Sequence, residues 1–200
     1  MPNYETAMST LTAAVTRYFT NATSGPGNGT TPPRRLINVS TTVNRALYGL
    51  DCVKEKTNCL GDNHDTNYIH SSRVPLASTD AFVFIGTNCV RNNKCTYSNI
   101  GFYKGHLTST PLSVDYRKMI GSAAYYAPSL DPAVADRLFA YAVMRECPKG
   151  NPFCIEIGTD VVKPKTGDWF AIYRTYLEPA TKTGPLVTEL VLPQLMHFGV

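Results

Sequence analysis

The chain is poor in charge and has no long hydrophobic run. Charged residues make up 17% of its 200 residues, less than is usual for soluble domains. A helix that spans a membrane needs about twenty consecutive apolar residues, and the sequence contains no such run. Lysine and arginine form no cluster typical of nucleic-acid binding. The densest basic group is the single pair Arg34–Arg35, which lies beside two prolines in a predicted loop. We therefore expect neither a membrane span nor a nucleic-acid partner.

Several sequence motifs of common enzyme classes are also missing. There is no Gly-x-Ser-x-Gly motif for a serine hydrolase and no His-Glu-x-x-His motif for a zinc protease. The segment Gly25–Gly27 is not a phosphate loop, because no strand is expected before it and no Gly-Lys-Ser/Thr follows. We therefore expect no cofactor and no metal site.

Cysteine, by contrast, is present in an informative arrangement. The six residues form three close pairs, namely Cys52 with Cys59, Cys89 with Cys95, and Cys147 with Cys154. Loop-closure entropy favours pairing within each pair, although sequence alone permits other connectivities. The gaps are longer than those of usual zinc ligands. The pattern predicts three local disulfides, and buried free thiols are the alternative.

The N-terminal region favours passage through the secretory pathway. Three N-glycosylation acceptors, Asn21, Asn28 and Asn38, occur in the first forty residues. The first twenty residues lack the basic start and apolar centre of a signal peptide. Disulfides and acceptor sites together still predict a secreted or extracellular protein, or one of the secretory lumen.

Hydrophobic periodicity predicts both helices and strands. An apolar stripe from residue 8 to 18 predicts a helix, and residues 114–126 and 131–145 predict two more, the last with Asp131 as its cap. Apolar runs predict strands at 81–86, 96–107, 153–162, 169–177 and 186–192, with a disulfide-closed hairpin joining the first two. Residues 36–50 fit either type, and residues 51–75 are predicted to be an irregular loop.

These elements predict an α+β fold. Helices and strands are segregated more than they alternate, which indicates a mainly antiparallel sheet with three to four helices, stapled by three local disulfides. We expect a single domain over residues 1–200, with an N-terminal helix and glycan-bearing loop in 1–35 and the main α+β body in 36–200.

The densest polar segment is 61–70. Asp62 and His64 fall on one side of an extended chain and could work as an acid–base pair, with Asp65 as a second carboxylate. Tyr68 and His70 follow as candidate ligand-binding residues. The alternative is a surface loop whose Asp and Asn side chains bond their own backbone.

Two arginines lie in apolar surroundings. Arg174 falls inside a predicted strand, where it needs a partner, and Glu156 is available for an ion pair. If Arg174 or Arg145 instead shares a cavity with Tyr173 or Tyr176, it would orient a carboxylate or carbonyl ligand.

Two further histidines stand apart from these groups. His106, at the end of a predicted strand, is a further candidate ligand-binding residue, and His197 lies near the C-terminus. Each alone is typical of a structural or exposed histidine.

Three functions fit this sequence. The first is a secreted, disulfide-stapled module that binds a small organic or carbohydrate ligand in an apolar, tyrosine-lined cavity, since the chain holds twelve tyrosines. The second is a cofactor-independent lyase, isomerase or hydrolase that uses His64 with Asp62 or Asp65, and Arg174 as an anion clamp. The third is an extracellular structural or interaction protein. The sequence leaves the oligomeric state open.

Overall fold

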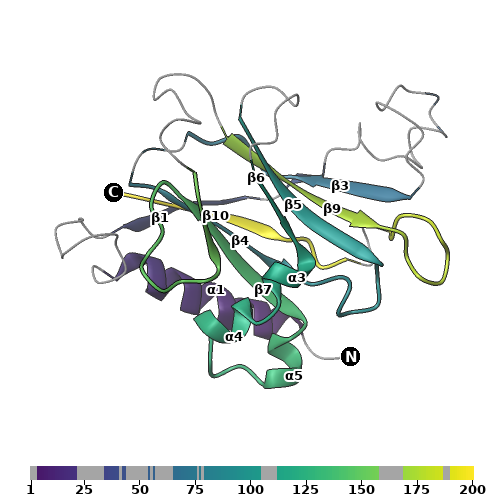
Figure 1. The fold of residues 1–200 in the computed structure, drawn as a ribbon, viewed down its shortest axis with the longest axis horizontal. Helices are drawn as coiled ribbons and strands as arrows, with labels where there is room; N and C mark the ends of the chain where they lie inside the picture. The colour runs from purple at the N-terminus through teal and green to yellow at the C-terminus, as the bar shows by residue number, and fades with distance from the viewer. Residues whose placement is uncertain are drawn as a thin grey trace.

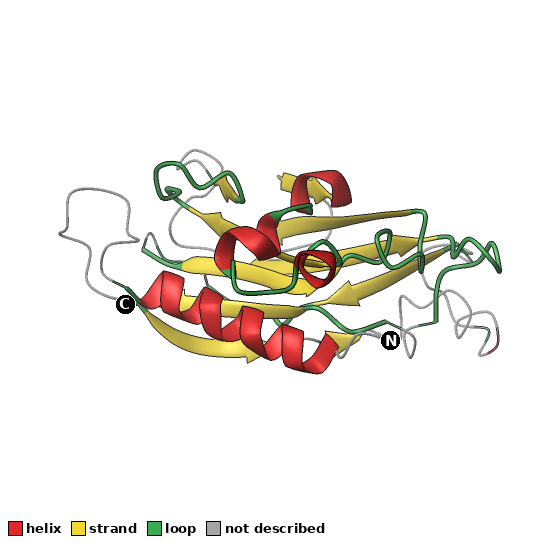
Figure 2. Ribbon diagram, turned by 90° about the horizontal axis from the view of Figure 1, so that it is seen from below, coloured by secondary structure: helices red, strands yellow, loops and turns green. Residues whose placement is uncertain are grey.

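Two five-stranded sheets face each other, and a long helix covers the far side of one of them (Figures 1 and 2). Sheet A has the strand order β1-β10-β4-β7-β8, and sheet B the order β2-β3-β9-β5-β6. The computed structural model describes residues 4–21, 34–40, 42–43, 54, 56, 65–75, 77, 79–104, 112–157, 169–186 and 190–200.

All strand pairs in the described residues are antiparallel except β7 with β8, so the predicted mixture of helices and mainly antiparallel sheet is confirmed. The helices are α1 (Tyr4–Thr20), α3 (Tyr116–Met119), α4 (Ser122–Tyr126) and α5 (Pro132–Ala135). Sheet A contains β1 (Arg35–Ser40), β10 (Gln194–Gly199), β4 (Ala81–Thr87), β7 (Leu138–Met144) and β8 (Cys154–Glu156). Sheet B contains β2 (Thr42–Val43), β3 (Thr66–His70), β9 (Trp169–Tyr176), β5 (Tyr97–Lys104) and β6 (Leu112–Asp115).

Helix α1 is amphipathic and was predicted correctly. Its buried residues include Met8, Leu11, Val15 and Phe19, which recur at three- and four-residue intervals and pack on sheet A. The opposite face of sheet A packs on sheet B. The two sides of sheet A therefore bury two separate cores, one under the helices and one between the sheets.

Those two cores explain why the predicted helix at 131–145 is wrong. Asp131 does cap a helix, accepting bonds from the backbone N–H groups of Ala133 and Val134, but α5 is short. Strand β7 follows and is buried throughout. Its residues alternate between the two cores, as Phe139 and Ala140 do. An apolar run buried on both sides lacks the polar alternation that marks a strand.

Other element predictions were also corrected. Residues 66–70, predicted as part of a loop, form β3, in which the half-buried Tyr68 and His70 lie on either side of the buried Ile69. The last strand begins after Pro193, as β10, and residues 186 and 190–192 are outside any strand. The predicted helix at 114–126 is instead the end of β6 followed by α3 and α4.

The predicted hairpin between residues 81 and 107 does not form. Both of its strands exist, but β4 pairs with β10 and β7 in sheet A, whereas β5 pairs with β6 and β9 in sheet B. Cys89 and Cys95 do form a disulfide. It therefore closes the connection between the two sheets rather than the turn of a hairpin.

A second disulfide joins Cys147 to Cys154, between β7 and its parallel neighbour β8. Two of the three predicted disulfides are therefore present. The third predicted pair, Cys52 and Cys59, lies outside the described residues.

Candidate functional site

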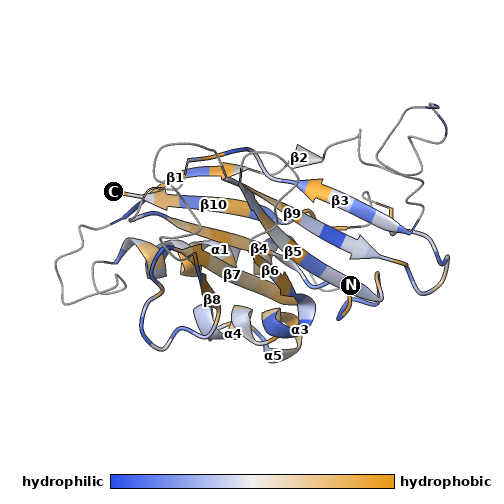
Figure 3. Ribbon diagram, turned by 45° about the horizontal axis from the view of Figure 1, so that its top comes forward, coloured by the Kyte–Doolittle hydropathy of each residue, from blue (hydrophilic) through white to orange (hydrophobic). Residues whose placement is uncertain are grey.

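The outer face of sheet B collects aromatic and basic side chains. Ile69, Ile100 and Tyr173 point into the core between the sheets, so their strand neighbours point the other way. The register places Tyr68 and Asn99 on either side of Arg174 in a row across β3, β9 and β5. Figure 3 shows hydrophilic bands on these three strands, whereas β10, β4 and β7 are mostly hydrophobic. We call this surface the tyrosine–arginine face and define it as Tyr68, His70, Arg73, Asn99, Tyr103, Phe170 and Arg174.

Arg174 lies at its centre, between two tyrosine rings. Its guanidinium carbon is 5.4 Å from the ring centres of both Tyr68 and Tyr103, within the range of cation–π attraction. One guanidinium nitrogen donates to the Tyr103 hydroxyl, and another donates to Asn99 Oδ1 at 3.4 Å. Both accepting groups are neutral. The predicted ion pair with Glu156 is wrong, because Glu156 lies in sheet A and accepts a bond from the Cys147 backbone N–H.

A histidine and a second arginine border Arg174. The His70 ring stacks on Phe170 with 6.0 Å between ring centres, and the Arg73 guanidinium carbon lies 4.8 Å above the same phenyl ring. Burial, followed by the positive charges of Arg174 and Arg73, lowers the pKa of His70 to about 4. His70 is therefore a neutral imidazole at pH 7.

The sheet holds this face in a defined shape. Tyr103, Phe170 and Ile172 form a small buried cluster against which Tyr68 packs, and the rings of Tyr103 and Phe170 stack at 5.3 Å. Gly101 leaves the space that the arginine uses, because a Cβ atom there would come within 2.9 Å of Arg174 Nη1. Side chains packed against a sheet in this way lose little further freedom when a ligand binds.

The structure brings together some of the predicted residues and separates others. Tyr68, His70, Arg174 and Tyr176 share the outer face of sheet B. Tyr173 points the opposite way, into the core, where burial raises its pKa to about 12. The remaining predicted positions His64, Asp62 and His106, as well as Asn28, lie outside the described residues.

Two more predicted residues are accounted for. Asp65 is half-buried just before β3 and accepts a bond from the Thr66 hydroxyl at 3.2 Å. Arg145 directly follows strand β7 instead of ending a helix, and burial lowers its pKa. Neither residue belongs to the tyrosine–arginine face.

Four members of this face were not predicted from the sequence: Arg73, Asn99, Tyr103 and Phe170. One of them carried a usable signal, because Phe170, Arg174 and Tyr176 are separated by even numbers of residues in one predicted strand and so share a face. The other three come from segments whose pairing with β9 depends on long-range register, which no local pattern encodes.

A buried polar cluster lies on sheet A, beside β10. His197 Nε2 is 3.0 Å from Asp80 Oδ2, and the same Asp80 oxygen accepts the Ala77 backbone N–H at 2.8 Å. Arg34 is buried nearby and donates to the Thr79 carbonyl. These bonds fix the loop before β4 against β10, which is a structural role.

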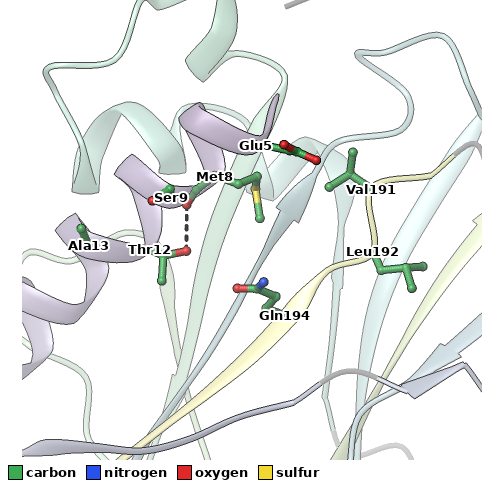
Figure 4. A pocket seen from close by; sticks show the side chains of 8 residues that line it. All are labelled: Glu5, Met8, Ser9, Thr12, Ala13, Val191, Leu192 and Gln194. Carbon is green, nitrogen blue, oxygen red and sulfur yellow. Dashed lines mark hydrogen bonds between the residues drawn. The ribbon is translucent and has the colours of Figure 1, made fainter. Parts of the chain in front are cut away.

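A groove of about 560 Å³ runs between α1 and the segment that leads into β10 (Figure 4). The α1 side contributes one carboxylate and several small side chains, and Thr12 donates to the Met8 carbonyl there. It is lined by Glu5, Met8, Ser9, Thr12, Ala13, Val191, Leu192 and Gln194. No tyrosine is among these residues, so this groove differs from the tyrosine-lined cavity predicted from the sequence.

No helix in the described part of the chain is long and apolar enough to cross a membrane. Within the same residues, no three His, Cys, Asp or Glu side chains gather closely enough to hold a metal ion. No protein-family model, curated protein or solved structure matches the chain.

Proposed function

We propose that this protein is a secreted module that binds a small organic or carbohydrate ligand on the tyrosine–arginine face. The observation that carries the proposal is the position of Arg174 between the rings of Tyr68 and Tyr103, with neutral oxygens as its hydrogen-bond partners. Aromatic rings offer flat apolar area, and their hydroxyls, an amide and a guanidinium offer directed hydrogen bonds. Sugars and planar organic molecules need both kinds of contact.

Secretion is supported by the covalent features of the chain. The described residues contain two disulfides, which persist in oxidising compartments. Asn21 follows α1 and Asn38 lies on β1, and both are exposed, as glycan acceptors must be.

A second candidate function is binding of another extracellular protein along β1. This strand is at the edge of sheet A, and its side chains Leu36, Ile37 and Val39 are 36%, 53% and 40% exposed. Exposed apolar residues on an edge strand are typical of surfaces that pair with another chain. The enzyme hypothesis stays a prediction, because Asp65 is the one member of its acid–base group among the described residues.

The test is a binding screen with disulfide-intact protein. Mono- and oligosaccharides and small aromatic acids and alcohols are titrated into ¹⁵N-labelled protein, and shifts of amide NMR signals locate the binding surface. We expect shifts confined to β3, β5 and β9, and loss of affinity in Tyr68→Ala.

The matched control is Tyr125→Ala. Tyr125 is an exposed tyrosine on α4, far from sheet B in the fold, so its removal should leave affinity unchanged. Shifts that map to the groove beside α1, or equal affinity in both variants, would contradict the proposal.

A further inference from the structure

The tyrosine–arginine face carries positive charge. Arg174 lies in its centre and Arg73 over Phe170, and the two charges act together on the imidazole of His70. Since His70 is neutral at pH 7, Arg174 and Arg73 are the charged side chains among the residues that define this face.

Arg174 has more N–H donors than it uses in hydrogen bonds to the described residues. A guanidinium has five N–H groups, and within the described residues those of Arg174 that donate do so to the amide of Asn99 and the hydroxyl of Tyr103. Neither partner neutralises its charge. Arginine so placed binds carboxylate or sulfate oxygens through charge-assisted, often paired, hydrogen bonds.

The nearest described carboxylates on these strands have other hydrogen-bond partners. Asp115 lies opposite Asn99 in the register, but it caps α3 and accepts the backbone N–H groups of Arg117 and Lys118. Asp65, before β3, accepts the Thr66 hydroxyl and adds to the burial that raises the pKa of Tyr176 at the C-terminal end of β9. The centre of the face thus lacks a described acidic side chain beside its arginine.

The surroundings of the arginines favour a sugar ring over a bare anion. Next to Arg174 are the half-buried ring of Tyr68 and the half-buried amide of Asn99, which suit stacking and hydroxyl contacts, whereas the phenol of Tyr103 is buried and holds the guanidinium in place. An inorganic anion would use the charge alone and leave these groups without a role in binding.

We infer that the ligand of this face is an acidic saccharide, a sugar that carries a carboxylate or sulfate group, with the acidic group on Arg174 and the ring against Tyr68. The inference rests on the proposed function, because it names the ligand class of the same surface.

The experiment compares matched pairs of sugars. Galacturonic acid trisaccharide is compared with the neutral galactose trisaccharide, and galactose 6-sulfate with galactose, by NMR titration at pH 7. We expect the acidic member of each pair to bind at least about tenfold more tightly, as for one charge-assisted contact. The preference should shrink as salt is raised, since the charges are partly exposed.

Arg174→Gln should remove the preference for the acidic sugar. Arg73→Gln, at an exposed position, should reduce the preference for the acidic sugar. This variant provides the test if Arg174→Gln does not fold. Arg117→Gln is the control, because Arg117 also lies over a tyrosine ring, 4.9 Å from the centre of Tyr116, but on α3. It should leave the preference intact.

Three results would overturn the inference. Equal binding of neutral and acidic sugars would reject the acidic class but keep the proposed function. Competition by inorganic sulfate as strong as that of galactose 6-sulfate would make the face a bare anion site. Absence of binding by every sugar and aromatic probe would reject the proposed function together with the inference.

Discussion

The hydroxyl of Tyr173 lies 3.4 Å from the Sγ atom of Cys89, and it donates to the Thr87 carbonyl at 3.2 Å. Tyr173 belongs to β9 of sheet B, whereas Thr87 ends β4 of sheet A. One phenol therefore ties the two sheets together beside the disulfide Cys89–Cys95, deep in the core between them.

Tyr173→Phe should reduce the free energy of unfolding by about 1 kcal/mol, the usual value of one buried hydrogen bond. The ring would stay, so packing would change little. Urea unfolding measures the loss. Tyr116→Phe is the control, since this tyrosine is half-buried on α3 and outside the core. Equal stability of Tyr173→Phe and the native chain would contradict the structural role.

The two described disulfides should differ in their response to reductant. Cys89 and Cys95 are 1% and 2% exposed, whereas Cys147 and Cys154 are half-buried. Because thiolate attack requires access to sulfur, Cys147–Cys154 should open first under native conditions. Alkylation followed by peptide mass spectrometry gives the order.

Replacing Cys89 and Cys95 together by alanine should cost about 2–3 kcal/mol of stability, by the loop-closure model for a short loop. A variant as stable as the native chain would show that the Cys89–Cys95 disulfide does not stabilise the fold by restricting the conformations of the unfolded chain.

Histidine titration should make stability depend on pH. The pKa of His70 is lowered from 6.5 to about 4 in the folded chain, so between these values the unfolded chain binds more protons. The contribution of neutral His70 to the free energy of unfolding is therefore complete above pH 6.5, and it is lost as the pH falls towards 4. After allowance for solvent screening, the effect is of the order of 1–2 kcal/mol.

The measurement is urea unfolding of the native chain and of His70→Gln at pH 7 and pH 5. The native chain should lose more stability than the variant over this interval, because carboxylates contribute equally to both. Identical losses would show that His70 is accessible to protons in the folded state.

Two glycines should respond to alanine in different ways. At Gly101 the added Cβ would meet Arg174 Nη1 at 2.9 Å and Tyr103 Cε2 at 2.8 Å, so the arginine must move. At Gly86 it would meet Pro193 Cβ at 2.8 Å, next to β10. Gly101→Ala should weaken ligand binding, and Gly86→Ala should lower stability by about 1–3 kcal/mol through overpacking.

Binding titrations and thermal unfolding of both variants separate these effects. Unchanged affinity in Gly101→Ala would argue against a ligand at Arg174.

The elements that could be predicted from the sequence were those whose local pattern fits one type, either a single apolar stripe or an apolar run rich in aromatic and β-branched residues. Helix α1 shows a single apolar stripe, and β9 was recognised as an apolar strand. Strand β7 was mistaken for a helix because its run contains the helix formers Leu138, Ala140 and Ala142 and follows a capped helix start at Asp131, while burial of both sides leaves no polar alternation to mark the strand. Strand β3 was mistaken for a loop because its outward side chains are polar.

The site was only partly visible for a related reason. Tyr68, His70 and Arg174 stood out as polar or aromatic residues, but their contact depends on β3 pairing with β9 over about a hundred residues of chain. Asn99 and Tyr103 reach Arg174 through a second such pairing. Local patterns predict which residues are unusual, and tertiary register decides which of them meet.

The position of β10 in sheet A bears on how this chain is made in the cell. β10 lies between β1 and β4, so neither of these strands has this pairing partner until residues 194–199 have left the ribosome. Until then, each presents a bare edge to other nascent chains. The close cysteine pairs, by contrast, can cross-link as soon as each loop emerges. Synthesis would thus close the disulfide loops early and leave sheet A open until β10 has emerged, a period in which a chaperone would protect the open edges.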